Sequence, residues 1–328
     1  MSLIIISIII LIASLAGLIL SSQFIINTIE KFMELTKKSE TIIGFVILAA
    51  ISSFAELTVA IFSIIERVPG IAVGDIFGSH LFNICIVIGI LSILGFFKNV
   101  HEKTLIEMVD VLVLASIIPI LLLISEFRQI LANGSIIIGV ILISIYFISM
   151  YSIGKARIPF LTEEDKLNKD NKISGNSIIN KKEKIKLLVK IFIGGAIVVI
   201  SGRFTIYSAV IIIEYFKLVP IAFGAKIISI GTSLPELVIC YLAAKKGKIN
   251  LALADAIGAN LTTSTLILGI VLVFSPFTIN LLIFTELILF IIIVNIILWR
   301  FLMKGEIPPY IGMVLILIYI VFQAVVSF

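Results

Sequence analysis

The sequence predicts an all-α integral membrane protein, with ten transmembrane helices arranged as two inverted five-helix repeats and broken helices at the core. Three observations predict this fold: an apolar composition, long apolar runs separated by short polar segments, and a similarity between the two halves of the chain. Hydrophobic residues make up 60% of the 328 residues and charged residues 14%, whereas about 25% of the residues of a soluble domain are charged. Lipid is the solvent that fits this composition.

Ten apolar runs are long enough to cross a bilayer, which takes about 20 residues of helix. The only long polar stretch, 154–186, lies between the fifth and sixth runs and predicts a solvated linker. We therefore expect a first five-helix repeat at 1–153 and a second at 187–328. The expected spans are 3–27, 41–65, 70–96, 105–125, 130–153, 187–213, 219–243, 250–274, 279–299 and 307–327.

Basic residues between the spans predict the orientation, because cytoplasmic loops carry an excess of Lys and Arg. The loops after the odd-numbered spans contain 19 Lys and Arg, and the loops after the even-numbered spans contain 3. The sequence therefore predicts a multi-pass protein of the cell membrane, with both termini extracellular and the 154–186 loop cytoplasmic. Because the basic residues form short clusters between apolar runs, and not a binding stripe, we expect no nucleic acid partner.

The two halves share residues at a constant offset of about 180 positions, which indicates an internal repeat. Each half has an odd number of spans, so the second half must run opposite to the first. Inverted repeats are typical of secondary transporters, whose substrate site lies near the bilayer midplane where the repeats meet. The matches include Ser53, Glu56 and Leu57 with Ser233, Glu236 and Leu237, and Asp75, Gly78 and Leu81 with Asp255, Gly258 and Leu261.

Two glutamates, Glu56 and Glu236, occupy the middle of the second span of each half. A carboxylate at this depth costs a few kcal/mol and is typical of a polar cavity that holds a cation. Carboxylate, hydroxyl and carbonyl oxygens are the hard donors that suit Ca²⁺ or Na⁺. Gly231 and Pro235 indicate that the second of these helices can break and free its carbonyls. The nearby hydroxyls are those of Ser52, Ser53, Thr232 and Ser233.

The third span of each half carries an acidic residue near its start. Asp75, Ser79 and Asn83 are spaced four residues apart, so they line one helical face. Asp255, Ala259 and Thr263 have the same spacing. We expect Asp75 to lie near the outer end of its span and Asp255 near the inner end of its own, where each draws cations into a vestibule. The alternative is that each is an acidic residue at a helix start that interacts with the helix dipole. His80, beside Ser79, is interpreted as a packed histidine in preference to a titrating one.

Four segments resemble the calcium/cation antiporters, and specifically the sodium/calcium exchangers. SIGTSLPEL at 229–237 is similar to the second alpha-repeat motif of that superfamily, and AISSFAEL at 50–57 to the first. VGDIFGSHLFN at 73–83 and LADAIGANLTT at 253–263 resemble the helices that follow. The alpha-repeat regions extend over 44–90 and 224–270, and the resemblance covers nearly the whole chain.

This resemblance implies a secondary antiporter that exchanges Ca²⁺ for Na⁺ by alternating access. It implies a Ca²⁺ site at Glu56 and Glu236, with flanking Na⁺ sites made of hydroxyls and carbonyls. The ions are substrates, and no cofactor or protein partner beyond the lipid bilayer is expected. The implied cation ligands are Glu56, Glu236, Ser52, Ser53, Thr232, Ser233, Ser79 and Asn83, with backbone carbonyls near Ala49 and Ser229; Thr263, Asp75 and Asp255 are added as candidates.

The sequence departs from the family pattern mainly at the Na⁺ ligands. Ala259 replaces the usual Ser, and Thr263 stands where the family has Asp or Asn. The calcium pair is intact but the sodium ligands are depleted, so H⁺ exchange for Ca²⁺ or another divalent ion is the alternative function. Ile51 and Ala55 replace a Gly and a Pro, which indicates a milder break in the first repeat.

Two remote alternatives come from other classes of protein. An intramembrane aspartyl protease would use Asp75 and Asp255, but it needs both carboxylates at one depth, and the inverted topology separates them. A passive cation channel would use the same polar residues without alternating access. We therefore expect a transporter and not an enzyme.

Overall fold

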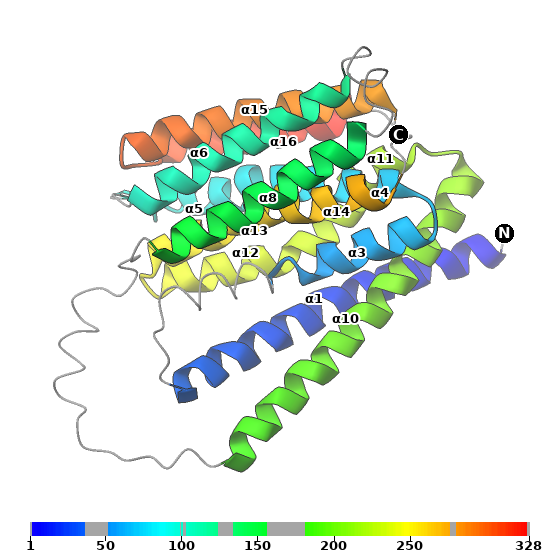
Figure 1. Ribbon diagram of the computed structural model, residues 1–328, viewed down its shortest axis with the longest axis horizontal. Coiled ribbons are helices and arrows are strands. Elements are labelled where there is room, and N and C mark those ends of the chain that lie inside the picture. Colours follow the sequence, from blue (N-terminus) through cyan, green and yellow to red (C-terminus); the bar gives the residue numbers. More distant parts are fainter. Residues whose placement is uncertain are drawn as a thin grey trace.

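The computed structural model describes residues 2–36, 52–98, 100, 103–123, 134–155, 181–275 and 280–326, and every regular element in these ranges is helical (Figure 1). The expectation of an all-α protein is confirmed. The elements are α1 (Ser2–Thr36), α3 (Phe54–Ile65), α4 (Pro69–Leu81), η1 (Phe82–Ile88), α5 (Gly89–Ile93), α6 (Lys103–Ile117), η2 (Ile118–Leu123), α8 (Gly134–Lys155), α10 (Lys181–Phe216), α11 (Pro220–Phe223), η3 (Gly224–Ile228), α12 (Ser229–Lys245), α13 (Ile249–Thr262), η4 (Thr263–Ile267), α14 (Leu268–Phe274), α15 (Leu281–Met303) and α16 (Pro309–Val325).

Eight helices in the described ranges are long and apolar enough to cross a membrane. They coincide with eight of the ten expected spans. The other two spans are represented by the shorter apolar helices Phe54–Ile65 and Pro309–Val325. The first part of the expected 41–65 span, through residue 51, lies outside the described residues.

The long helices α1 and α10, of 35 and 36 residues, form a pair along one side of the molecule (Figure 1). Their buried apolar side chains form one cluster with a few from α3, α4 and α11, and the larger cluster contains the rest of α4 together with the other helices. The outward side chains of α1 include Leu3, Ile9 and Ile12, each more than half exposed. Such a surface suits contact with lipid tails.

Three spans near the centre of the molecule contain a π-helical segment in the described ranges: η1 follows α4, η3 precedes α12, and η4 follows α13. A π-helical turn is wider than an α-helical turn and is frequent at functional sites. In these three spans the irregularity is a widened turn, whereas the span that contains α3 is described only from residue 52 and its α-helix is interrupted at Ser53. Helix α12 continues through Pro235, which has no N–H to donate to the carbonyl of Gly231.

Glycines bring α4 into backbone contact with the α11–η3 segment. Gly74 lies against the carbonyl group of Ile221, and Gly224 lies against the carbonyl group of Ile71. Small residues allow such close helix crossings in membrane proteins. A Cβ atom at either glycine would overlap the facing oxygen, so this crossing depends on glycine.

We expect Gly74→Ala to destabilise the protein by about 1–3 kcal/mol, because the added methyl group overpacks the α4–α11 crossing. Gly195→Ala is the matched control, since the nearest side-chain atom to its new Cβ would be 3.9 Å away, on Phe54. Thermal unfolding of both variants in detergent measures the difference. Equal melting temperatures for the two variants would show that the crossing tolerates a methyl group.

Candidate cation-binding site

Glu56 and Glu236 are the centre of the candidate site. Glu56 lies in the first turn of α3, near the positive end of its helix dipole, and Glu236 follows Pro235 in α12. Both side chains are 0% exposed. Contacts between α3 and α12, and of each with α4, bring the two helices together although 180 residues separate the glutamates.

The charge around the two glutamates is negative. Glu56 and Glu236 interact electrostatically with each other and with Asp75 and Asp255. Within the described residues, no Lys or Arg contributes to this interaction, and no side chain donates a hydrogen bond to the four glutamate oxygens. A buried carboxylate without a cation or donor is costly, so this arrangement favours a bound cation.

Asp75 joins the site through a threonine of the opposite half. The hydroxyl of Thr232 donates to Asp75 Oδ1 at 2.8 Å and lies 3.2 Å from Ser79 Oγ. Thr232 is four residues before Glu236, so this bond links the carboxylate of α4 to the glutamate of α12. The second oxygen of Asp75, Oδ2, takes no hydrogen bond from the described residues.

Asp75 and Asp255 lie near the starts of their helices, as expected, but the expectation that they line exposed vestibules is wrong. Their side chains are 0% and 1% exposed, and both interact with Glu56 and Glu236. Each lies six residues into its helix, about 9 Å from the helix start at 1.5 Å per residue. At that depth the neighbouring helices enclose both aspartates. The thiol of Cys240 lies 3.6 Å from Asp255 Oδ2.

The structure places the remaining predicted residues around this centre with different partners. Ser53 Oγ and Ser233 Oγ are buried and have no hydrogen-bond partner among the described residues. The hydroxyl of Ser229 instead donates to the carbonyl of Ala225 at 2.6 Å, within its own helix. Ser52 is also buried, whereas Ala49 lies outside the described residues.

Asn83 and Thr263 lie where π-helical segments begin. Asn83 Nδ2 donates to Asn260 Oδ1 at 2.9 Å, and Asn260 Nδ2 donates to the carbonyl oxygen of His80 at 3.2 Å. Thr263 donates to the carbonyl of Asn260 at 3.1 Å. Sequence reasoning missed Asn260. Two features of the sequence could have indicated it: Asn260 lies in the 253–263 motif, and it is the repeat counterpart of His80, 180 positions later.

His80 is a packed histidine that links four helices. Its Nδ1 lies 2.9 Å from Ser264 Oγ in η4, and its Nε2 lies 2.8 Å from Asn295 Oδ1 in α15. Asn295 Nδ2 donates to Ser116 Oγ of α6 at 2.9 Å. The ring is 0% exposed, and both of its nitrogens are hydrogen-bonded in this network.

The type of ligand limits which ions suit the site. In the described part of the chain, no group of three or more His, Cys, Asp or Glu side chains is placed to hold a metal ion by itself. Any ion at Glu56 and Glu236 must therefore draw on hydroxyl, amide and carbonyl oxygens as well. That mixture of neutral and charged oxygens is typical of Ca²⁺ and Na⁺ sites and unlike a zinc site.

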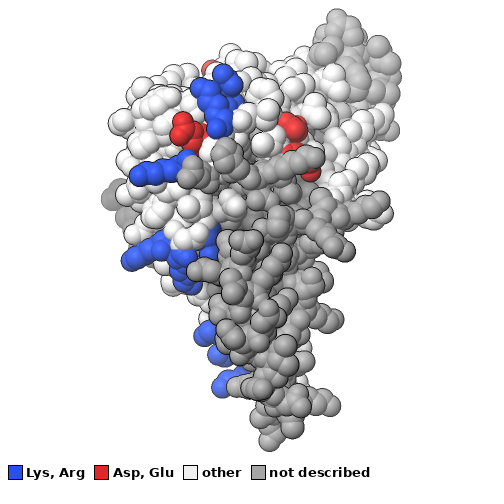
Figure 2. Space-filling model, turned by 90° about the vertical axis from the view of Figure 1, so that its left-hand side faces the viewer, with Lys and Arg blue, Asp and Glu red and all other residues white. Residues whose placement is uncertain are grey.

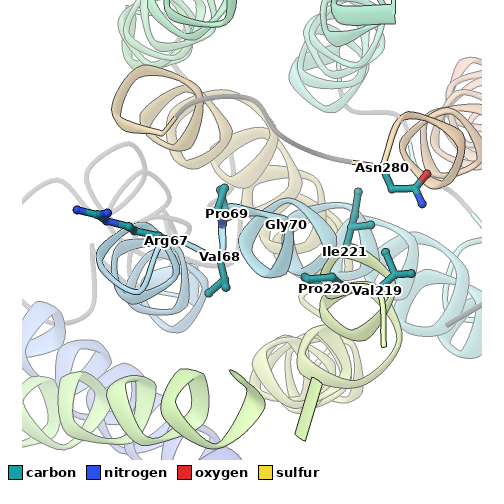
Figure 3. Close-up of a pocket in the computed structure, with 8 residues that line it drawn as sticks. All are labelled: Arg67, Val68, Pro69, Gly70, Val219, Pro220, Ile221 and Asn280. Atoms are coloured by element: carbon teal, nitrogen blue, oxygen red, sulfur yellow. The ribbon is translucent and has the colours of Figure 1, made fainter. Parts of the chain in front are cut away.

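A pocket of about 130 Å³ lies where α4 and α11 begin (Figure 3). Figure 3 shows the Arg67 side chain extending away from Gly70 and Ile221. Gly74, which packs against Ile221, lies one turn beyond Gly70 in α4, and Asp75 follows it in the chain. The pocket is lined by Arg67, Val68, Pro69, Gly70, Val219, Pro220, Ile221 and Asn280.

Known proteins match both the sequence and the fold. The chain is 25% identical over 351 residues to the sodium/calcium exchanger MaX1 of Methanosarcina acetivorans, across 97% of this chain and 98% of MaX1. It is 28% identical over 238 residues to the putative antiporter CaxA of Alkalimonas amylolytica, across 73% of this chain and 71% of CaxA. The fold is similar to a solved structure of the sodium-calcium exchanger NCX_Mj, with a TM-score of 0.67 and 22% identity, covering 99% of this chain and 100% of that one.

The model of the family described as sodium/calcium exchanger protein matches residues 6–154 and 186–328. These two segments make up most of the chain and include all four motifs. Exchangers are transporters, which excludes the aspartyl protease alternative. The chain belongs to the sodium/calcium exchanger protein family, and it is a multi-pass membrane transporter and not an enzyme.

Proposed function

We propose that the protein is a secondary antiporter that exchanges Ca²⁺ for Na⁺ by alternating access. The observation that carries the proposal is the pair Glu56 and Glu236, fully buried, with four carboxylate oxygens to which no described side chain donates. The likeness to MaX1 and NCX_Mj, which are named as exchangers of these two ions, supports the choice of substrates.

The proposed Ca²⁺ ligands are the two glutamates and the neutral oxygens around them. Ca²⁺ takes six to eight oxygen ligands at about 2.3–2.6 Å. Besides the glutamate oxygens, Asn83 Oδ1 and the hydroxyls of Ser53 and Ser233 are buried without a hydrogen-bond partner in the described ranges. The proposed Na⁺ ligands add Ser52, Thr232, Ser79 and Thr263, with backbone carbonyls near Ala49 and Ser229.

The two-repeat organisation and the orientation belong to the same proposal. The family model matches two segments and omits 155–185, within the proposed cytoplasmic linker. At one end of the molecule, exposed Lys and Arg side chains gather where α1, α12 and α15 end and α10 begins (Figure 2). They include Lys31, Lys186, Lys245, Lys246, Lys248, Arg300 and Lys304, whereas Arg67 and Lys217 lie at the opposite end. This asymmetry supports a cytoplasmic location for the first end.

H⁺ is the second candidate for the driving ion. Ala259 is fully buried on the face of α13 that carries Asp255, and its methyl side chain supplies no oxygen ligand there. Thr263, one turn later, uses its hydroxyl as a donor to the carbonyl of Asn260. Fewer side-chain oxygens remain for Na⁺ in this half, whereas Glu56 and Glu236 are able to bind protons directly after Ca²⁺ leaves.

We expect Glu56→Gln and Glu236→Gln each to reduce ⁴⁵Ca²⁺ uptake into proteoliposomes to background, because each removes one of the two charges proposed to hold the ion. Glu286→Gln in α15 is the matched control, since Glu286 is not among the charges that act on either glutamate. This control should transport normally. Near-normal uptake by either of the first two variants, with an unchanged melting temperature, would contradict the assignment.

Cysteine labelling tests the orientation. Asn171→Cys in the 154–186 loop should resist an impermeant thiol reagent added to intact cells and react after permeabilisation. Glu66→Cys, in the exposed turn between α3 and α4, should react from outside. The native Cys85 and Cys240 are buried and give little background. Efficient labelling of Asn171→Cys in intact cells would reverse the proposed topology.

The driving ion is tested with Ala259→Ser, which adds a hydroxyl on the Asp255 face of α13. We expect the variant to lower the Na⁺ concentration for half-maximal Ca²⁺ exchange by roughly two- to tenfold, the effect of one added oxygen ligand. Uptake into proteoliposomes under separately imposed Na⁺ and H⁺ gradients provides the measurement. Steep Na⁺ dependence of the unmodified protein, without any response to a pH gradient, would contradict the depletion of its Na⁺ ligands.

A further inference from the structure

The side-chain amide of Asn83 can face a cation in two orientations, and only one of them allows it to bind the cation. Its side-chain amide presents an acceptor oxygen on one side and a donor NH₂ group on the other. An ion such as Ca²⁺ binds the oxygen and is repelled by the NH₂ group. Whatever holds Asn83 in one orientation therefore decides whether it is a ligand.

A chain of hydrogen bonds sets that orientation, and it begins at a backbone carbonyl. The carbonyl oxygen of His80 can only accept, so the group of Asn260 that faces it is Nδ2, at 3.2 Å. The other side of the Asn260 amide, Oδ1, then faces Asn83 and requires a donor. Asn83 supplies its Nδ2 at 2.9 Å, and its Oδ1 remains buried with no partner in the described ranges.

Every other combination of the two amide orientations brings two acceptors together. Rotating Asn83 alone places its oxygen against Asn260 Oδ1. Rotating both amides restores that bond but places Asn260 Oδ1 against the carbonyl of His80. Because a buried acceptor that loses its donor is costly, the observed orientation is strongly favoured.

The starting point of the chain is itself held in place. The carbonyl of His80 belongs to the last turn of α4, next to the π-helical segment η1. The ring of the same residue is bonded to Ser264 and Asn295 on two other helices. The carbonyl oxygen therefore has little freedom to turn away from Asn260.

We propose that Asn260 is a positioning residue that orients the Asn83 amide so that its oxygen, and not its NH₂ group, faces the transported cation. The inference rests on the proposed function, in which Asn83 is a cation ligand. Asn260 itself need not touch the ion. The rival explanation is that Asn260 only attaches α13 to α4 and contributes to stability.

The test is a double-mutant cycle on the full-length protein in proteoliposomes, with KM and maximal rate for ⁴⁵Ca²⁺ uptake measured separately. Asn260→Ala frees the Asn83 amide to rotate and should raise KM by roughly five- to tenfold, with a smaller effect on the maximal rate. Asn83→Asp presents an oxygen in either orientation. When Asn260 is present, the second carboxylate oxygen of this aspartate faces Asn260 Oδ1. Two acceptors then meet and repel each other, so the single variant should also raise KM.

The double variant Asn83→Asp/Asn260→Ala should have a lower KM than Asn260→Ala alone, because an aspartate needs no orienting partner. If the aspartate acted only through its charge, it would change KM by the same factor in both backgrounds, and that result would overturn the inference. So would an unchanged KM in Asn260→Ala. If Asn260→Ala fails to fold, Asn260→Ser replaces it in the cycle, since its short hydroxyl cannot bridge both partners.

Asn83→Ala separates this inference from the proposed function. If KM for Ca²⁺ is unchanged in Asn83→Ala, Asn83 is not a ligand and the proposed ligand set fails. If Asn83→Ala raises KM but Asn260→Ala does not, the ligand set holds and only the role of Asn260 is wrong.

Discussion

The main physical constraint on this structure is that it buries negative charge in a low-dielectric interior. Glu56, Glu236, Asp75 and Asp255 lie within interaction range of one another. Among the described residues, no Lys or Arg is one of the charges that act on Glu56 or Glu236. Desolvation and mutual repulsion both oppose this arrangement, and a cation or bound protons relieve both. A protein that relies on its substrate for this compensation passes most easily between conformations when the site is loaded, which is the requirement for exchange without leak.

The surrounding helices hold hydroxyl and amide oxygens close to the buried carboxylates. Two of the π-helical segments carry a polar side chain that reaches another helix: Asn83 of η1 bonds to Asn260, and Ser264 of η4 lies 2.9 Å from His80 Nδ1. The Thr232–Asp75 bond and the Asn83–Asn260 bond both join residues from opposite halves of the chain. Contacts of this kind couple the two halves beside the buried carboxylates.

The amino-acid sequence predicts the membrane fold, ten spans of which eight are found as long apolar helices in the described ranges, and the two glutamates that lie buried together. These follow from apolar run length and from carboxylates that recur 180 positions apart, signals that need no knowledge of packing. The depth of Asp75 and Asp255 could not be predicted in the same way. Position along a helix gives the distance from its end but not how many neighbouring helices enclose it.

The partners of Asn83 and His80 were also beyond the reach of sequence reasoning. Asn260 approaches Asn83 only because η1 and α13 pack together at that level, and this contact depends on helix packing as a whole. The π-helical segments have no local sequence signal comparable to a proline or a glycine pair. Pro235 did predict an irregularity in its span, but the widened turn occurs earlier, at Gly224–Ile228.

The glycine crossing between α4 and α11 has a consequence for how fast these two helices can separate. The contact there is main chain against main chain, with Gly74 against the carbonyl of Ile221. Side chains change rotamer in picoseconds to nanoseconds, whereas packed helices separate only in collective motions of microseconds to milliseconds. A contact made of main chain has no side-chain rotamer that could release it, so α4 and α11 separate at this level only when whole helices move, on the slower of these timescales.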